Sequence, residues 1–200
     1  MQPARRQVFQ PDPAKLVASH IEAGAVGRAE VENFIREVFA RHYGARVSAF
    51  APNLLMLQQR GRIVAATGWR SARCEPLFLE RYLDAPIEQL LSQLANQPVR
   101  REHIVEVGNL AADMPGGSPQ VIMALASHLD RHGYDWVVFT ATRELIRIFT
   151  RLGLPLLALA KADPARLGEA ASDWGSYYET EPIVVAGRID VAMDRIGRHA

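Results

Sequence analysis

The segment from His103 to Leu159 constrains the fold more than any other part of the chain, because it predicts an unbroken alternation of strands and helices. Three runs predict strands, and two amphipathic runs between them predict helices: HIVEVGNLAA, QVIMALASHLDRHG, WVVFTAT, RELIRIFTRLG and LPLLALA. The glycine turn DMPGGSP joins the first strand to the first helix. A helix that begins at such a turn between parallel strands presents amides to an anion. The pattern therefore predicts a ligand with a nucleotide or phosphopantetheine tail.

The length of 200 residues predicts one domain over residues 1–200, because domains are commonly about 100 to 200 residues long. With 23 basic against 22 acidic residues, the net charge is +1, and no general affinity for nucleic acid is expected. The first residues lack the apolar core of a signal peptide, and no apolar run approaches the ~18 residues of a membrane span. We therefore expect a cytoplasmic protein without a transmembrane segment.

The single cysteine, Cys74, excludes an intramolecular disulfide and a multi-cysteine metal site. Cys74 is expected to be a small packed thiol, with a catalytic nucleophile as the alternative.

The N-terminal part predicts a short opening strand, RQVFQ, followed by helix from Pro13 to Ala40. Apolar residues at spacings of three and four indicate the helix, and Gly24 and Gly27 divide it in two.

The next segments, RVSAFAPNLLMLQQ and RIVAATGWRSA, predict an antiparallel hairpin that turns at Arg60 and Gly61. Pro52 marks a bulge or an edge position. LFLERYLD and PIEQLLSQLANQ predict a short helix and a regular one, the second with Pro86 in its first turn.

The C-terminal part predicts a long loop, KADPARLGEAASDWGSYYETEP, with a short helix near Ala165–Ala171. PIVVAGRIDVAM predicts a final strand. LPLLALA and PIVVAGR are expected to pair antiparallel, with the long loop as a flap over one end of the sheet.

Four residues of the glycine turn suit an anion site at the helix start. Ser118 and Pro119 suit the N-cap and the first helical position. Gly116 and Gly117 permit a positive φ and bring amides close to a ligand. A tight turn without a ligand is the alternative.

Glu106 is the candidate general base. It lies between Val105 and Val107, so its side chain projects to the opposite face of the sheet. Burial of a carboxyl group raises its pKa toward neutrality, as a base requires. A structural ion pair with Arg100 or Arg101 is the alternative.

The order of these elements resembles the GNAT acyltransferase superfamily and its relatives, the acyl-homoserine lactone synthases. The resemblance implies an α/β (α+β) fold with a mixed, mostly antiparallel sheet flanked by helices, and a central parallel strand pair splayed around a pantetheine slot. It implies a bulged strand, Ile104–Ala112, that holds the pantetheine arm, and a loop, Met114–Gln120, that holds pyrophosphate. The implied cofactor-binding residues are Leu110, Ala111, Ala112, Gly116, Gly117, Ser118 and Gln120.

Two positions depart from those families. IFTRLGL, Ile148–Leu154, is similar to L-Y-E-K-L-G-F, but Phe149 stands at the tyrosine that often protonates the leaving thiolate in GNAT enzymes. EVGNL is similar to the E-x-x-R-F of the lactone synthases, with Glu106 at the glutamate and Asn109 at the arginine. Asn109 either orients a substrate amide or carbonyl, or satisfies the backbone at the bulge.

Six strings resemble the bacterial thermostable hemolysin family: FLERYLDAPIE, EVGNLA, WVVFTAT, RLGL, ADPARL and WGSYYETEP. That family name records lysis, yet the sequence contains no long amphipathic membrane segment or apolar hairpin.

Candidates for the acceptor pocket fall in two segments. Glu80 and Asp84 are four residues apart and would share a helix face, either to hold an amine or as a solvated acidic surface. Arg81 and Tyr82 flank them. Three aromatic residues of the flap either line an acyl channel or pack the loop onto the sheet: Trp174, Tyr177 and Tyr178.

Three histidines complete the candidates. His128 and His132 share a helix face at metal-ligand spacing, but no third ligand lies in that segment, so surface histidines and no metal site are expected. His103 is a candidate acid or base at the start of the strand.

Together with these patterns, the resemblance implies an N-acyltransferase that moves an acyl group from an acyl-CoA or acyl-carrier-protein thioester to an amine or another small acceptor. No metal is required. Glu106 and Asn109 are the predicted catalytic residues. The alternatives are a non-catalytic protein that binds acyl or pantetheine groups, and a membrane-lytic hemolysin.

Overall fold

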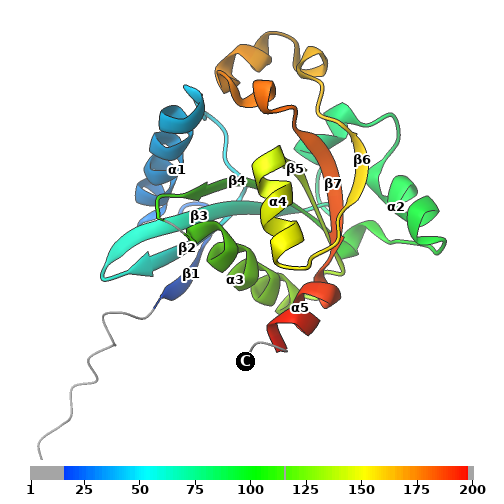
Figure 1. The fold of residues 1–200 in the computed structure, drawn as a ribbon, viewed down its shortest axis with the longest axis horizontal. Helices are drawn as coiled ribbons and strands as arrows, with labels where there is room; N and C mark the ends of the chain where they lie inside the picture. The colour runs from blue at the N-terminus through cyan, green and yellow to red at the C-terminus, as the bar shows by residue number, and fades with distance from the viewer. Residues whose placement is uncertain (1–15, 115, 198–200) are drawn as a thin grey trace, which may run out of the picture.

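A seven-stranded sheet forms the centre of the computed structural model, which describes residues 16–114 and 116–197 (Figure 1). The strand order is β1-β2-β3-β4-β5-β7-β6. All neighbouring strands are antiparallel except the parallel pair β4 and β5, which confirms the expected mixed sheet. The strands are β1 Val17–Ile21, β2 Asn53–Gln59, β3 Arg62–Ser71, β4 Ile104–Ala112, β5 Trp136–Ala141, β6 Leu157–Lys161 and β7 Ile183–Arg188.

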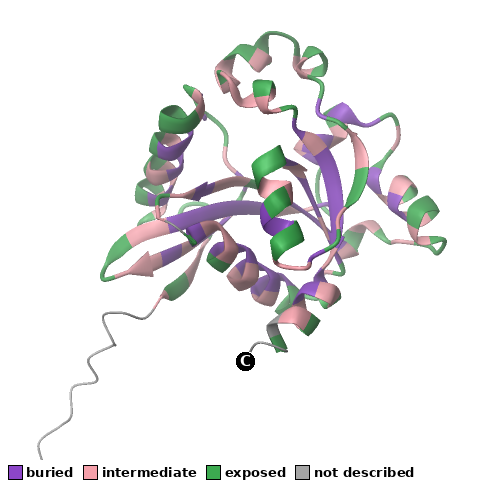
Figure 2. Ribbon diagram, in the orientation of Figure 1, coloured by how far each residue is buried: buried purple, intermediate pink, exposed green. Residues whose placement is uncertain are grey.

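Helices cover both faces of the sheet. Successive residues of a strand point to opposite faces, so one strand packs against helices on both sides. Ala65 packs with α3 and Ala66 packs with α1. The middle strands of the sheet, such as β3 and β7, are largely buried, whereas the edge strands β1 and β6 are not (Figure 2). We call the two sides the α3 face and the α1 face. The helices are α1 Arg28–Tyr43, α2 Ile87–Ala95, α3 Gly117–Arg131, α4 Arg143–Arg151 and α5 Ile189–Gly197; the 3₁₀ helices are η1 Phe78–Tyr82, η2 Arg101–His103, η3 Pro164–Trp174 and η4 Tyr177–Thr180.

The prediction of a helix before Gly24 is wrong. Residues Val17–Ile21 form the edge strand β1, which pairs antiparallel with β2. The ladder with β2 satisfies the backbone of this segment, and the position of β2 cannot be read from the local periodicity. The second expected helix is confirmed as α1. The expected strand RQVFQ lies outside the described residues.

The expected final strand is correct only as far as Arg188. Ile189 begins α5, and Ile189 and Ala192 are buried at helical spacing. The hairpin of β2 and β3 is confirmed, with positive φ at Arg60 (52°) and Gly61 (74°). Pro52 lies just before β2, and residues 46–52 are not a strand.

The last two strands pair as expected. β6 and β7 are antiparallel, and the chain between them forms η3 and η4 (Figure 1). We call residues 162–182 the flap.

The parallel pair separates part-way along its length. β4 and β5 pair only from Ile104↔Trp136 to Val107↔Phe139. Beyond this point β4 continues along β3 to Ala112, and β5 continues along β7 to Ala141. A bulge coincides with the separation: the register of β3 and β4 shifts between Ala66 and Gly68, and Asn109 has a φ of 54°. The splayed strand pair is therefore confirmed.

Candidate functional site

A cavity of about 640 Å³ lies where β4 and β5 separate. Its walls include Glu106 and Tyr82 from the α1 face and Ile122 and Phe149 from the α3 face. Because both faces contribute, the cavity extends through the sheet at the splay. Its volume falls within the usual range of ligand sites, about 300 to 1,000 Å³.

Glu106 is buried in the wall of this cavity, with 7% of its surface exposed. Its Oε2 accepts a hydrogen bond from the Phe78 amide at 2.8 Å, and its Oε1 accepts one from the Leu79 amide at 2.9 Å. The Nε of Arg70 lies 3.5 Å from Oε2. Arg70 is the cross-strand neighbour of Glu106 in the β3–β4 register, so the alternative of an ion pair is present, with Arg70 in place of Arg100 or Arg101.

Burial raises the pKa of Glu106 above its ordinary value. The two backbone amides and Arg70 act in the opposite direction, but burial outweighs them. A carboxylate has about four lone-pair sites, so each oxygen retains capacity for a further donor. Glu106 can therefore accept a proton or a hydrogen bond from a molecule in the cavity.

Asn109 lines the cavity beside Glu106 in the left-handed conformation, which asparagine adopts more readily than most residues. A methyl group added to Gly68 would lie 3.3 Å from Asn109 Oδ1, so the side chain approaches β3 closely. Both interpretations of Asn109 remain compatible with this position.

The start of α3 differs from expectation. Gly116 is the N-cap, with a φ of 79°, and Gly117 is the first helical residue, so Ser118 and Pro119 are not the N-cap and the first position. Gly117 is not in the positive-φ region. It is needed for space instead, because an added Cβ would lie 3.1 Å from Ala112 Cβ.

The amides and side chains of this turn are not equally available. The Gly117 amide donates to the Met114 carbonyl at 3.0 Å. Ser118 lines the cavity together with Leu110 and Ala112. Ala111 packs with α1, and Gln120 lines a separate groove.

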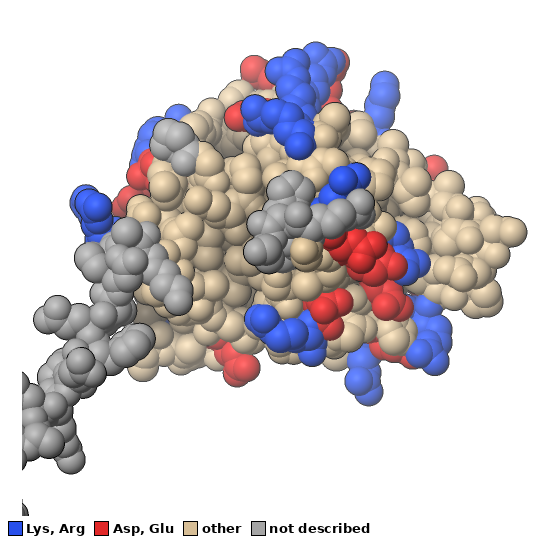
Figure 3. Space-filling model, turned by 60° about the horizontal axis from the view of Figure 1, so that its bottom comes forward, with Lys and Arg blue, Asp and Glu red and all other residues tan. Residues whose placement is uncertain are grey.

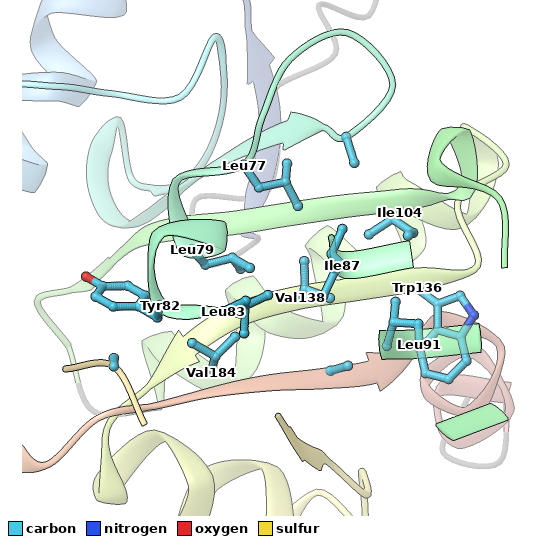
Figure 4. Close-up of a cluster of buried hydrophobic side chains, with 13 residues drawn as sticks. Leu77, Leu79, Tyr82, Leu83, Ile87, Leu91, Ile104, Trp136, Val138 and Val184 are labelled. Atoms are coloured by element: carbon cyan, nitrogen blue, oxygen red, sulfur yellow. The ribbon is translucent and has the colours of Figure 1, made fainter. Parts of the chain in front are cut away.

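Five of the expected acceptor-pocket residues lie in the cavity wall: Arg81, Tyr82, Trp174, Tyr177 and Tyr178. The flap and η1 are therefore in contact at the cavity wall, where the Tyr82 and Tyr178 hydroxyl oxygens are 2.5 Å apart. Figure 4 shows the Tyr82 ring at the edge of a buried cluster that includes Leu79 and Val138, with its hydroxyl pointing away from the cluster. Burial and the neighbouring hydroxyl raise the pKa of Tyr82 well above its usual range.

Glu80 and Asp84 lie outside the cavity wall. Glu80 accepts hydrogen bonds from the amides of Leu77 and Ile87 at 2.8 and 3.1 Å. Arg101 Nη1 lies 2.7 Å from its Oε1. Asp84 is exposed and pairs with Arg166. Because η1 ends at Tyr82, the two carboxylates share no helix face, and Glu80 is a half-buried ion-pair partner of Arg101.

The other candidates also lie elsewhere. His128 is buried rather than on the surface, with its ring centroid 4.8 Å from His20 and 4.3 Å from His132. Over residues 16–114 and 116–197, no three His, Cys, Asp or Glu side chains are arranged to hold a metal ion. His103 is outside the cavity wall and contacts Asp135. Cys74 is exposed, not packed.

The family model for thermostable hemolysin matches residues 21–193. The chain belongs to the thermostable hemolysin family. No helix in the described part of this family member is both long and apolar enough to span a bilayer. On the face shown in Figure 3, basic and acidic side chains are interspersed with uncharged surface.

Solved structures share the fold of this family member at low sequence identity. A CoA-dependent acyl-homoserine lactone synthase, BjaI, is 16% identical with a TM-score of 0.61, covering 92% of this chain and 90% of that one. The AHL synthase LasI is 12% identical with a TM-score of 0.56, covering 88% and 91%. FeeM, an N-acyl amino acid synthase from uncultured soil microbes, is 12% identical with a TM-score of 0.56, covering 87% and 89%. No protein with a curated description matches the sequence.

Phe149 of this thermostable hemolysin family member lies in the cavity wall, and its ring centroid is 4.9 Å from that of Phe139. A phenyl ring has no proton to donate, so a tyrosine acid is absent from this position. Sequence reasoning missed Arg70, whose place depends on the register of β3 against β4.

Proposed function

We propose that the protein transfers an acyl group from an acyl-CoA or acyl-carrier-protein thioester to the amine of a small acceptor. The observation that carries the proposal is the cavity through the splay of β4 and β5, with buried Glu106 at one end and apolar side chains at the other. The likeness to a CoA-dependent synthase and to an N-acyl amino acid synthase supports it.

An extended pantetheine arm matches the edge of β4 that β5 no longer covers, residues 108–112. Its amides can pair with this edge as an added strand would. The amides of residues 110–112 would polarise the thioester carbonyl. Ser118, which lines the cavity at the start of α3, would hold the donor phosphates, because the Gly117 amide already donates to Met114. Ile122, Ile148 and Phe149 provide an apolar wall for the acyl chain.

The acceptor nitrogen would attack the thioester carbonyl carbon. A C–N bond forms, the C–S bond breaks, and the proton lost by nitrogen ends on the thiol. Glu106, whose pKa is raised by burial, would accept that proton first, directly or through a water molecule. Because Phe149 cannot donate a proton, the thiolate would receive its proton from Glu106 or from solvent.

The decisive experiment mixes the purified protein with short- and long-chain acyl-CoA and a panel of amines, and measures free thiol and amide product. Amide formation supports the proposal. Thioester binding without thiol release would favour the second candidate function, a non-catalytic acyl-binding protein. The presence of Phe149, which cannot donate a proton, is the observation that favours this second candidate. Absence of both would contradict both functions.

The phosphate subsite has a separate test in Ser118→Asp. An acidic residue in the first turn of α3 is compatible with the helix dipole but repels a phosphate. The variant is expected to bind acyl-CoA more weakly by about tenfold or more and to bind acyl-N-acetylcysteamine, which lacks phosphate, as the wild type does. Equal weakening of both donors would contradict the subsite. Gly117 is unsuitable for this test because an added Cβ would crowd Ala112.

A further inference from the structure

Arg81 is a cation in the cavity wall for which the fold supplies no anion. It lines the cavity, and within the described ranges it forms no hydrogen bond or ion pair. Two other arginines of the cavity wall are paired with carboxylates: Arg46 with Asp173, and Arg70 with Glu75 and Glu106. Arg81 is thus a guanidinium available to a ligand.

The Arg81 side chain is also held in place. Its Cζ lies 4.9 Å from the centre of the Phe78 ring, a cation–π contact that leaves the edge of the guanidinium free. A planar guanidinium fixed on a ring loses little further freedom when it forms two parallel hydrogen bonds to a carboxylate.

Phe78 connects Arg81 to the proposed base. The Phe78 amide donates to Glu106 Oε2 at 2.8 Å, while its ring supports Arg81. One residue of η1 therefore fixes a carboxylate and a guanidinium that line the same cavity. An acceptor with an amine and a carboxylate complements both charges, whereas a simple amine leaves Arg81 without a partner.

We infer that the acceptor is an amino acid, bound with its amine toward Glu106 and its carboxylate on Arg81. The inference rests on the proposed acyl transfer. Donor phosphate is the other anion that could reach a guanidinium, but the proposed phosphate site lies at the start of α3, separate from η1. The aromatic wall formed by Trp174 and Tyr178 would contact the amino acid side chain.

The test compares free amino acids with their carboxamides, using phenylalanine, leucine, β-alanine and γ-aminobutyrate and one acyl-CoA donor. Wild-type protein is expected to have a KM about tenfold or more lower for an acid than for its amide. Arg81→Gln should raise KM for the acid by a similar factor, leave kcat within about threefold, and leave the amide unaffected. Arg81→Lys should recover part of the loss. Arg62→Gln, an exposed arginine outside the cavity wall, is the matched control and should leave every constant unchanged.

Three results distinguish failure of the amino acid inference from failure of the proposed acyl transfer. Amide products with equal KM for acids and amides would overturn the inference and keep the acyltransferase. A raised KM for acyl-CoA in Arg81→Gln, with the acceptor KM unchanged, would assign Arg81 to the donor phosphates and overturn it as well. If no thiol is released, calorimetric titration decides: binding of an amino acid that Arg81→Gln abolishes supports the subsite, and no binding refutes it.

Discussion

The hydroxyl of Thr67 donates a hydrogen bond to the backbone carbonyl of Gly108 across 3.0 Å. Thr67 is fully buried, and it lies where the register of β3 against β4 shifts. A side chain of β3 thus provides a partner for the β4 backbone just before Asn109, where the ladder is irregular. This contact stabilises the bend that separates β4 from β5.

Thr67→Val should lower the free energy of unfolding by about 1 kcal/mol, because the variant keeps the shape of the side chain but loses the part-buried hydrogen bond to the Gly108 carbonyl. Affinity for an acyl thioester should fall as well, since the bend shapes the cavity. Denaturant unfolding and calorimetric titration measure the two effects. Thr150→Val, which removes an exposed hydroxyl that bonds to the Ile146 carbonyl on α4, should change stability by no more than about 0.5 kcal/mol. Equal effects of the two variants would contradict a role for Thr67 at the bulge.

Asn109→Gly and Asn109→Ala separate the two interpretations of this residue. Its φ of 54° favours glycine, so Asn109→Gly should keep the stability of the wild type, while Asn109→Ala should cost about 1 kcal/mol. If the amide orients a substrate, both variants lose turnover although only one loses stability. Full turnover in Asn109→Gly would leave Asn109 with a backbone role alone. Steady-state kinetics beside thermal unfolding provides both readouts.

The periodicity of residues 103–159 was enough to predict the centre of the sheet. Each element there is long and has one clear period, and β4, α3, β5 and α4 follow in the expected order. The errors fall at the ends, where other forces decide. Val17–Ile21 is a strand because β2 offers it a ladder, and Ile189 begins a helix because it packs against α3. Neither neighbour is visible in the local sequence.

The site was predictable where one strand or one segment defines it. The position of Glu106 follows from alternation along β4, and the flap aromatics follow from their density. Arg70 was not predictable, because a cross-strand pair depends on register. The sequence predicts a longer helix in which Glu80 and Asp84 share a face, whereas η1 ends at Tyr82 and Glu80 bonds to Arg101.

Glu80→Gln should destabilise the protein without changing the acceptor KM. Its carboxylate accepts two amide hydrogen bonds and faces Arg101, which also pairs with Glu88. Burial raises the pKa of Glu80, but its bonds to Arg101 and to the backbone outweigh burial and leave the pKa below its ordinary value. Its stabilisation is therefore present above the unfolded pKa of about 4.3 and is lost as the pH falls through the lower folded value. Loss of about 1 to 3 kcal/mol at pH 7 is expected in denaturant unfolding. A raised acceptor KM with unchanged stability would return Glu80 to the acceptor site.

Glu106→Gln should lower kcat by about 10² to 10⁴ with little change in thioester affinity, as expected for loss of a general base. Unchanged turnover would remove Glu106 from that role. The variant also leaves one of the amides of Phe78 and Leu79 without an acceptor, so stability must be measured beside activity.

The contribution of Glu106 to the free energy of unfolding should decrease as the pH rises. Because burial raises the folded pKa of Glu106, the native state holds its proton to a higher pH than the unfolded chain, whose pKa is about 4.3. The contribution of Glu106 is therefore fully present below pH about 4 and declines as the pH rises through the folded value. The stability advantage of the wild type over Glu106→Gln should shrink over that interval. An advantage that grows with pH would contradict the raised pKa.

His128→Leu should remove a source of acid sensitivity. Burial, together with His132, His20 and Arg131, lowers the pKa of His128 to about 4, and its Nε2 is buried with no hydrogen-bond partner in the described residues. The unfolded chain takes up this proton near pH 6.5, so the stabilisation from neutral His128 is complete above that pH and is lost as the pH falls toward about 4. The variant should match the wild type at pH 7 and exceed it increasingly between pH 6.5 and 4. Parallel stability curves for the wild type and His128→Leu would show that His128 is protonated in the folded protein as readily as in the unfolded chain.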